Sequence, residues 1–187
     1  MIKKTKITVV GSGYVGMSLS VLLAQHNDVT VLDIDAERVE KVNKQKSTIS
    51  DSAIELFLAE KSLSLTATTD KSEAYKGASF VVVATPTNYD PETNRFDTGS
   101  VDAVVSDALR LNSEALVVIK STIPVGHTKS LQDKFLDNRV IFSPEFLREG
   151  QALHDNLYPS RIVVGSHLES AKRFADLLLS GARVKHV

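Results

Sequence analysis

Two carboxylates stand four residues apart in the segment Phe-Ser-Pro-Glu-Phe-Leu-Arg-Glu-Gly, where Glu145 and Glu149 follow the apolar run 140–142. Positioned carboxylates suit proton transfer and the orientation of an attacking water molecule. The structural alternative is a helix start, with Ser143 as the N-cap and Pro144 at the first helical position. That alternative accounts for Glu145, but not for Glu149, because like charges at i and i+4 are unfavourable on a helix. The rest of the chain has to decide between the two interpretations.

A glycine-rich turn, Gly-Ser-Gly-Tyr-Val-Gly at 11–16, follows a predicted strand at 6–10 and opens a predicted helix. In that context the G-x-G-x-x-G pattern is typical of a dinucleotide-binding turn. Gly11 permits the tight turn, Gly13 lets backbone N–H groups approach a pyrophosphate, and Gly16 lets the helix pack closely. The helix N-terminus favours the negative charge of the pyrophosphate. A glycine-rich turn without a ligand is the structural alternative.

A carboxylate follows the second predicted strand, in the sequence Leu-Asp-Ile-Asp at 32–35. Asp33 can accept hydrogen bonds from an adenosine ribose and would repel a 2′-phosphate, which favours NAD over NADP. Asp35 is expected to be the N-cap of the next helix. Arg38 either flanks the adenine side of the cofactor or is a plain surface residue.

Short apolar runs recur along the chain and predict its fold. We expect strands at 6–10, 29–32, 63–66, 80–84, 116–119, 140–142 and 162–164, and helices at 14–25, 36–45, 52–60, 101–111 and 169–179. We expect Ser52, Asp70 and Ser100 to cap helices. The strands are continuous apolar runs, as in sheets buried on both faces. The repeated units predict an α/β fold: a doubly wound, mostly parallel, Rossmann-like sheet with helices on both faces.

Polar clusters follow three of the later strands, at 85–88, 120–124 and 143–145. In an open α/β sheet, ligands bind beyond the carboxyl ends of the strands, so these clusters are expected to face one crevice. This favours a functional interpretation of Glu145 and Glu149. The connection 85–99 carries no secondary-structure signal, and is either functional or a solvated excursion.

Composition excludes several classes of protein. The net charge of −1 offers no basic field for nucleic acid, and no apolar run approaches the ~20 residues that span a bilayer. The sequence has no cysteine, and its five histidines show no metal-binding spacing, so we expect no metal site. We expect a cytoplasmic protein that binds neither nucleic acid nor membrane.

Taken together, these motifs resemble the NAD-binding domain of the UDP-glucose/GDP-mannose dehydrogenase family. The resemblance covers nearly the whole chain and rests on 11–16, Ala-Thr-Pro-Thr-Asn at 84–88, Lys-Ser-Thr-Ile-Pro-Val-Gly at 120–126, Ser-Pro-Glu-Phe-Leu-Arg-Glu-Gly at 143–150 and Asn-Leu-Tyr-Pro-Ser-Arg-Ile-Val-Val-Gly at 156–165. The Thr-Pro-Thr-Asn form is similar to the bacterial branch that oxidises UDP-glucose to UDP-glucuronate. The resemblance implies two NAD-dependent hydride transfers and a cysteine thioester.

The resemblance also implies roles for individual residues. Cofactor-binding residues would be Gly11, Gly13, Tyr14, Val15, Gly16, Asp33, Arg38, Thr87, Thr122 and Glu149. Thr122 and Glu149 would orient water, Glu145 would assist acid/base steps, and these three are the implied catalytic residues. Glu145, Phe146, Leu147, Arg148 and Glu149 would line the substrate pocket.

The chain departs from the family in having no cysteine for the nucleophile. We therefore expect residues 1–187 to be the NAD-binding domain of a longer enzyme, without the central helix and C-terminal substrate domain, and residues 181–187 to form one more strand. The full enzyme is expected to be a homodimer and the fragment a monomer. The alternatives are a dehydrogenase of GDP-mannose or UDP-N-acetylmannosamine, or a dinucleotide-sensing domain without chemistry.

Overall fold

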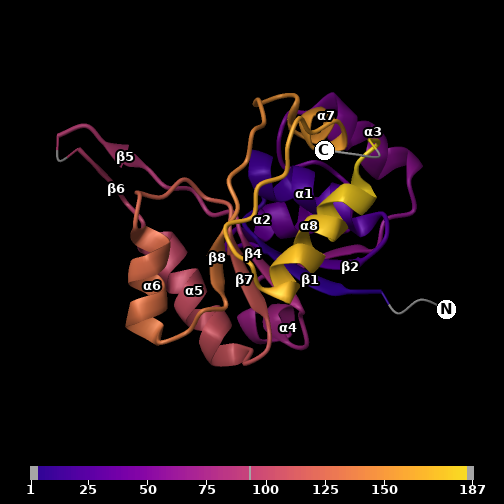
Figure 1. The fold of residues 1–187 in the computed structure, drawn as a ribbon. Coiled ribbons are helices and arrows are strands. Elements are labelled where there is room, and N and C mark those ends of the chain that lie inside the picture. Colours follow the sequence, from indigo (N-terminus) through magenta and orange to yellow (C-terminus); the bar gives the residue numbers. More distant parts are fainter. Residues whose placement is uncertain (1–3, 93, 185–187) are drawn as a thin grey trace.

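The computed structural model describes residues 4–92 and 94–184, and it is built around a six-stranded sheet. Neighbouring strands are all parallel, in the order β3-β2-β1-β4-β7-β8 (Figure 1). The strands are β1 (Lys6–Val10), β2 (Asp28–Leu32), β3 (Leu65–Thr68), β4 (Phe80–Val83), β7 (Leu116–Ile119) and β8 (Val140–Phe142). The strand order reverses between β1 and β4. The predicted doubly wound sheet is confirmed.

Helices cover both faces of the sheet. They are α1 (Tyr14–Ala24), α2 (Ala36–Asn43), α3 (Ser52–Glu60), α4 (Lys71–Tyr75), α5 (Gly99–Leu111), α6 (His127–Phe135), α7 (Ala152–Leu157) and α8 (Glu169–Gly181). Figure 1 shows α5 and α6 on one side of the sheet, and α1, α7 and α8 on the other. No helix in the described ranges is long and apolar enough to cross a membrane.

Two hydrophobic cores lie on the two faces of the sheet, and the central strands contribute to both. Along β4, Phe80 and Val82 join the core under α1 and α8, whereas Val81 and Val83 join the core under α5. All four of these residues are buried. Alternate side chains of a strand point to opposite faces, so a strand covered on both sides has to be apolar throughout. This is why continuous apolar runs predicted the sheet.

The structural alternative for this segment, a helix start at Ser143 and Pro144, is wrong, because polar groups of both residues bind groups outside the segment. The Ser143 hydroxyl donates to the Val163 carbonyl oxygen at 2.7 Å, and the Pro144 carbonyl oxygen accepts from the Lys120 amine at 2.9 Å. The segment stays irregular until α7 begins at Ala152. Glu145 and Glu149 therefore lie on a loop, where a like-charge penalty between helical neighbours does not arise.

The strand expected at 162–164 is also wrong. This segment lies beside β8, where Gly165 N–H donates to the Phe142 carbonyl oxygen at 2.8 Å. The Ser143 hydroxyl occupies the Val163 carbonyl oxygen, so a side chain takes the place of a ladder hydrogen bond. For the strand expected at 181–187, Gly181 ends α8 and 182–184 are irregular. The remaining residues, 185–187, lie outside the described part of the chain.

Two predicted caps are wrong and two are confirmed. The N-cap of α3 is Asp51 instead of Ser52, and the N-cap of α5 is Thr98 instead of Ser100. Asp51 is the N-cap because its carboxylate accepts from two backbone N–H groups of the first turn. Asp35 and Asp70 cap α2 and α4 in the same way, as expected.

Within the connection 85–99, the described residues form a short antiparallel hairpin that projects from the body (Figure 1). Its strands are β5 (Tyr89–Asp90) and β6 (Arg95–Phe96). The Tyr89 and Phe96 rings pack with centroids 5.2 Å apart, and Asn94 takes a left-handed backbone conformation with φ 52°. The absence of regular structure expected for this connection is thus corrected: an aromatic pair and a left-handed asparagine stabilise the hairpin.

Candidate active site

A crevice of about 860 Å³ opens at the carboxyl ends of the strands, where the strand order reverses. We call it the main crevice. The residues predicted from the sequence that line it are Gly11, Gly13, Tyr14, Val15, Asp33, Arg38, Thr87, Thr122, Glu145 and Glu149. These residues come from five connections that are far apart in the chain. The parallel sheet brings them together because it places every carboxyl end on the same edge.

The three glycines of the first turn differ in their surroundings. Gly11 has φ 98°, and a Cβ atom there would lie 2.6 Å from the Ala84 carbonyl oxygen. A Cβ atom on Gly16 would lie 1.9 Å from the Gly11 carbonyl oxygen, so the helix packs directly on the turn. Gly13 has no atom within 4 Å of the corresponding position. Gly11 and Gly16 are therefore needed for packing, whereas Gly13 leaves open space.

That open space adjoins the N-terminus of α1. Gly13 is the N-cap of this helix, no side chain caps it, and its first turn contains no acidic residue. The first N–H groups of a helix have no partners within the helix and carry partial positive charge. Gly13 and Tyr14 line the main crevice, so this end of the helix can receive an anion.

Asp33 is fixed at the end of β2 by hydrogen bonds and is only 8% exposed. Its Oδ2 atom accepts from the backbone N–H and the hydroxyl of Ser12, and its Oδ1 atom accepts from Asp35 N–H at 3.0 Å. Ser12 was not predicted to matter, although it lies inside the glycine motif. Arg38 is exposed, with Nε 3.6 Å from Asp35 Oδ2. The carboxylate is thus held in place before any ligand arrives.

The loops after β4 and β7 are tied to each other. The Ser121 hydroxyl donates to the Thr85 carbonyl oxygen at 2.6 Å, and the Ser100 hydroxyl donates to the Pro86 carbonyl oxygen at 2.9 Å. These bonds fix the loops that carry Thr87 and Thr122 into the main crevice. Ser121 belongs to the polar cluster at 120–124 that was expected to face the crevice, whereas Ser100 was expected only as a helix cap.

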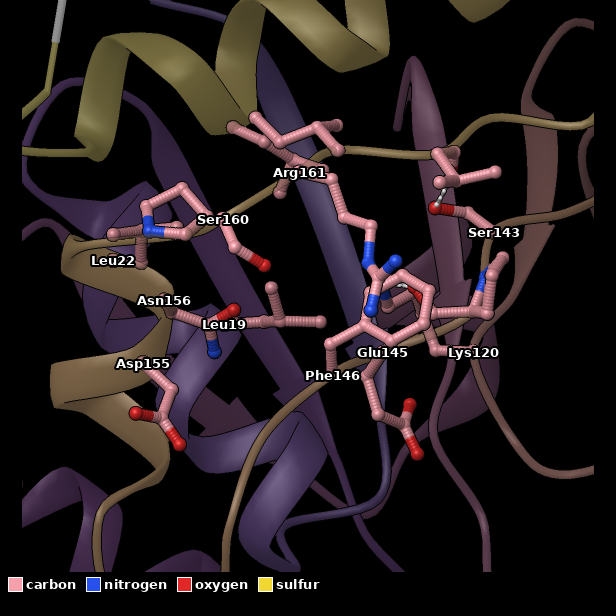
Figure 2. A pocket seen from close by; sticks show the side chains of 15 residues that line it. Leu19, Leu22, Lys120, Ser143, Glu145, Phe146, Asp155, Asn156, Ser160 and Arg161 are labelled. Carbon is pink, nitrogen blue, oxygen red and sulfur yellow. Dashed lines mark hydrogen bonds between the residues drawn. The ribbon is translucent and has the colours of Figure 1, made fainter. Parts of the chain in front are cut away.

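Glu145 is partly buried between the main crevice and a second, small cavity of about 40 Å³ (Figure 2). Burial raises the pKa of its carboxyl group, and the nearby Lys120 ammonium lowers it in part. Burial lowers the pKa of Lys120 to about 8, against the opposing influence of Glu145. Glu149 is exposed. The two carboxylates therefore have different surroundings, which is the condition for different acid/base roles.

The remaining predicted residues do not line the main crevice. Gly16 is buried under the turn, and Leu147 is half-buried. Phe146 lines the small cavity instead, with the Arg161 guanidinium 4.2 Å from its ring centroid. The Arg148 guanidinium is bound to Asp155 at 2.7 and 3.0 Å. Their predicted cofactor and substrate contacts stay predictions.

Comparison with known proteins decides the family. The model of the UDP-glucose/GDP-mannose dehydrogenase family, NAD binding domain, matches residues 5–180. This chain belongs to that family. UDP-glucose 6-dehydrogenase of Streptococcus pneumoniae is 52% identical over 95% of this chain, and that of Campylobacter jejuni is 45% identical over 97%. This chain spans 46% and 47% of the lengths of these two relatives.

A solved structure agrees with the family assignment. The UDP-glucose dehydrogenase of the archaeon Pyrobaculum islandicum superimposes with a TM-score of 0.83 at 29% identity. The match covers 95% of this chain and 44% of that one. The cofactor of the family domain is NAD, and the residues of this chain fit it. Gly13 leaves space beside the uncapped end of α1, and the Asp33 carboxylate lines the same crevice.

Proposed function

We propose that this chain is the NAD-binding portion of a UDP-glucose 6-dehydrogenase, which oxidises UDP-glucose to UDP-glucuronate. Two hydrides leave the primary alcohol carbon, and one water molecule supplies the second carboxylate oxygen. NAD, when bound, is the acceptor of these hydrides. The 187 residues contain no cysteine, so the thioester of this reaction would require a nucleophile outside them.

The main crevice carries the proposal, because it gathers the cofactor groups and the acid/base groups. The α1 end and Asp33 would hold the pyrophosphate and the adenosine ribose. Thr122 and Glu145 line the same crevice from the ends of β7 and β8. Thr122 and Glu149 would orient a water molecule, and Glu145 would take or return a proton during hydrolysis.

Identity to relatives favours UDP-glucose among the sugar nucleotides. Two relatives that share about half of the aligned residues with this chain are both UDP-glucose 6-dehydrogenases. Solved dehydrogenases of GDP-mannose and UDP-N-acetylmannosamine share the fold at 24% and 19% identity. Likeness at that level supports the fold and not the substrate.

A titration of residues 1–187 with NADH tests the cofactor part of the proposal. We expect saturable enhancement of NADH fluorescence and much weaker binding of NADPH. No saturable binding up to millimolar NADH would contradict it.

A second assay tests the requirement for a further segment. Residues 1–187 with UDP-glucose and NAD should form no NADH, whereas a chain extended to the length of the relatives should form two NADH for each UDP-glucuronate. UDP-glucuronate formed by residues 1–187 alone would refute the requirement. Turnover of another sugar nucleotide in preference to UDP-glucose would refute the substrate assignment.

A further inference from the structure

Lys120 is a buried lysine that the proposed reaction leaves without a role. It follows β7 directly and is 6% exposed. Its ammonium donates to the Pro144 carbonyl oxygen at 2.9 Å, one residue before Glu145. Burying an ammonium group is costly unless it is paired, and a single backbone carbonyl does not neutralise its charge. A neutral donor would serve to hold Pro144, so the charge itself calls for an explanation.

Glu145 presents the complementary feature. Its Oε2 atom is buried and has no hydrogen-bond partner among the described residues. Lys120 and Glu145 both line the small cavity, and Glu145 also lines the main crevice. The small cavity, at about 40 Å³, has room for a water molecule, which needs about 10–15 Å³ of such volume. A water there could accept from the Lys120 ammonium and donate to Oε2.

We propose that Lys120 is a positioning residue, which holds the Glu145 carboxyl group ionised at the wall of the main crevice. The inference rests on the proposed role of Glu145 in proton transfer. A carboxyl group that has to take up a proton must first be ionised, and burial opposes that state. A buried ammonium next to it, linked through Pro144 and the small cavity, restores the ionised form. The lysine and the glutamate would then titrate as a coupled pair.

The other charged groups around Glu145 do not replace Lys120. Arg161 lines the small cavity from the segment after α7, but its guanidinium lies over the Phe146 ring (Figure 2). Asp155 of α7 also lines this cavity, and Arg148 holds its carboxylate. Glu149 also lines the main crevice, but a carboxyl group cannot supply the positive charge that Lys120 provides. The directions of the pKa shifts agree: Glu145 opposes the burial effect on Lys120, and Lys120 opposes the burial effect on Glu145.

Two reciprocal substitutions test the coupling in residues 1–187. Lys120→Met keeps the length of the side chain and removes the charge, and it should raise the pKa of Glu145 by about one unit. Glu145→Gln should lower the pKa of Lys120 by the same amount, because coupling between two sites is mutual. Both values can be measured by NMR titration of ¹³C-labelled glutamate carboxyl and lysine Cε signals. Lys61→Met removes an exposed charge and is the matched control, with no expected shift.

Equal and opposite shifts of the two pKa values would support the proposal. An unchanged Glu145 pKa in Lys120→Met would overturn it, as would an unchanged Lys120 pKa in Glu145→Gln. The second measurement does not require Lys120→Met to fold. A lysine that only holds the Pro144 carbonyl would leave the Lys120 pKa unmoved in Glu145→Gln. NADH titration of the wild-type chain is independent of these shifts, so failure of the proposed function can be told apart from failure of the coupling.

Discussion

The same substitution at two glycines of one turn should have opposite consequences. Gly16→Ala places a methyl group 1.9 Å from the Gly11 carbonyl oxygen, a backbone atom that cannot move without opening the turn. Forcing extra atoms into a packed site costs typically about 1–3 kcal/mol, and this clash belongs at or above the upper end. Gly13→Ala meets no atom within 4 Å. The φ of Gly13 is −76°, which alanine adopts without strain.

Gly13→Ala should therefore mainly weaken cofactor binding, whereas Gly16→Ala should mainly lower the stability of the fold. The free energy of unfolding of Gly13→Ala should lie within about 1 kcal/mol of that of the wild-type chain, which is the size of an N-cap effect. Its methyl group would occupy the space beside the α1 N-terminus, so NADH affinity should fall at least about tenfold, which is about 1.4 kcal/mol. Gly16→Ala should lower the free energy of unfolding by about 3 kcal/mol or more.

Urea unfolding followed by circular dichroism measures the first quantity, and NADH fluorescence titration measures the second. The wild-type chain is the reference for both quantities. Unchanged NADH affinity in Gly13→Ala would refute the assignment of this space to the pyrophosphate. A Gly16→Ala chain as stable as the wild type would refute the packing argument.

Three further predictions concern charge and capping. Asp33→Asn keeps an oxygen for the Ser12 donors and removes the charge. It should therefore weaken NADH binding and reduce the ratio of NADH affinity to NADPH affinity. Equal weakening of NADH and NADPH binding would show that Asp33 does not contact the ribose. Burial lowers the pKa of Lys120 from 10.5 to about 8, so the folded state releases this proton at lower pH than the unfolded state does. The free energy of unfolding therefore gains a contribution as pH rises from 8 to 10.5, and this contribution is lost as pH falls through 8. The stability difference between the wild-type chain and Lys120→Met should therefore change by about 3 kcal/mol over that window in urea unfolding, and a constant difference would contradict the lowered pKa. Asp51→Ala should lower the free energy of unfolding by about 2–3 kcal/mol in the same assay, because Asp51 caps α3 and also accepts from Leu153 N–H. Replacement of the exposed Ser52, Ser52→Ala, should change it by less than about 0.5 kcal/mol. Equal effects of the two substitutions would favour the capping box expected from the sequence.

Short-range patterns predicted the sheet and the cofactor end of the site well. Each buried strand had to be apolar on both faces, and each carboxyl end had to reach the same edge. The glycine turn and Asp33 lie within one β–α–β unit, so their relation is local. Confirmation of the sheet therefore places Gly13 and Asp33 in the main crevice with no need of information from distant residues.

Contacts between distant segments explain what the sequence did not predict. The stretch that begins at Ser143 has an N-cap residue and a proline suited to a helix start, but its polar groups are bound by Lys120 and Val163. Because the Val163 carbonyl oxygen accepts from Ser143, the strand predicted at 162–164 does not form. Asp51 was overlooked as a cap because Ser52 and Glu55 offer a stronger local pattern. At Ser143 and at Val163 a partner more than ten residues away decided the outcome, and no local pattern shows such a partner.

The proposed cofactor site is tested most directly by mapping where NADH binds on residues 1–187. Backbone amide signals assigned by NMR can be followed during the titration, with resonance changes read residue by residue. We expect saturable shifts at Gly11, Gly13, Tyr14 and Asp33, with further shifts at Thr87 and Thr122. Saturable shifts confined to another face, with the amides of 11–16 unmoved, would refute the assignment of the main crevice to the cofactor.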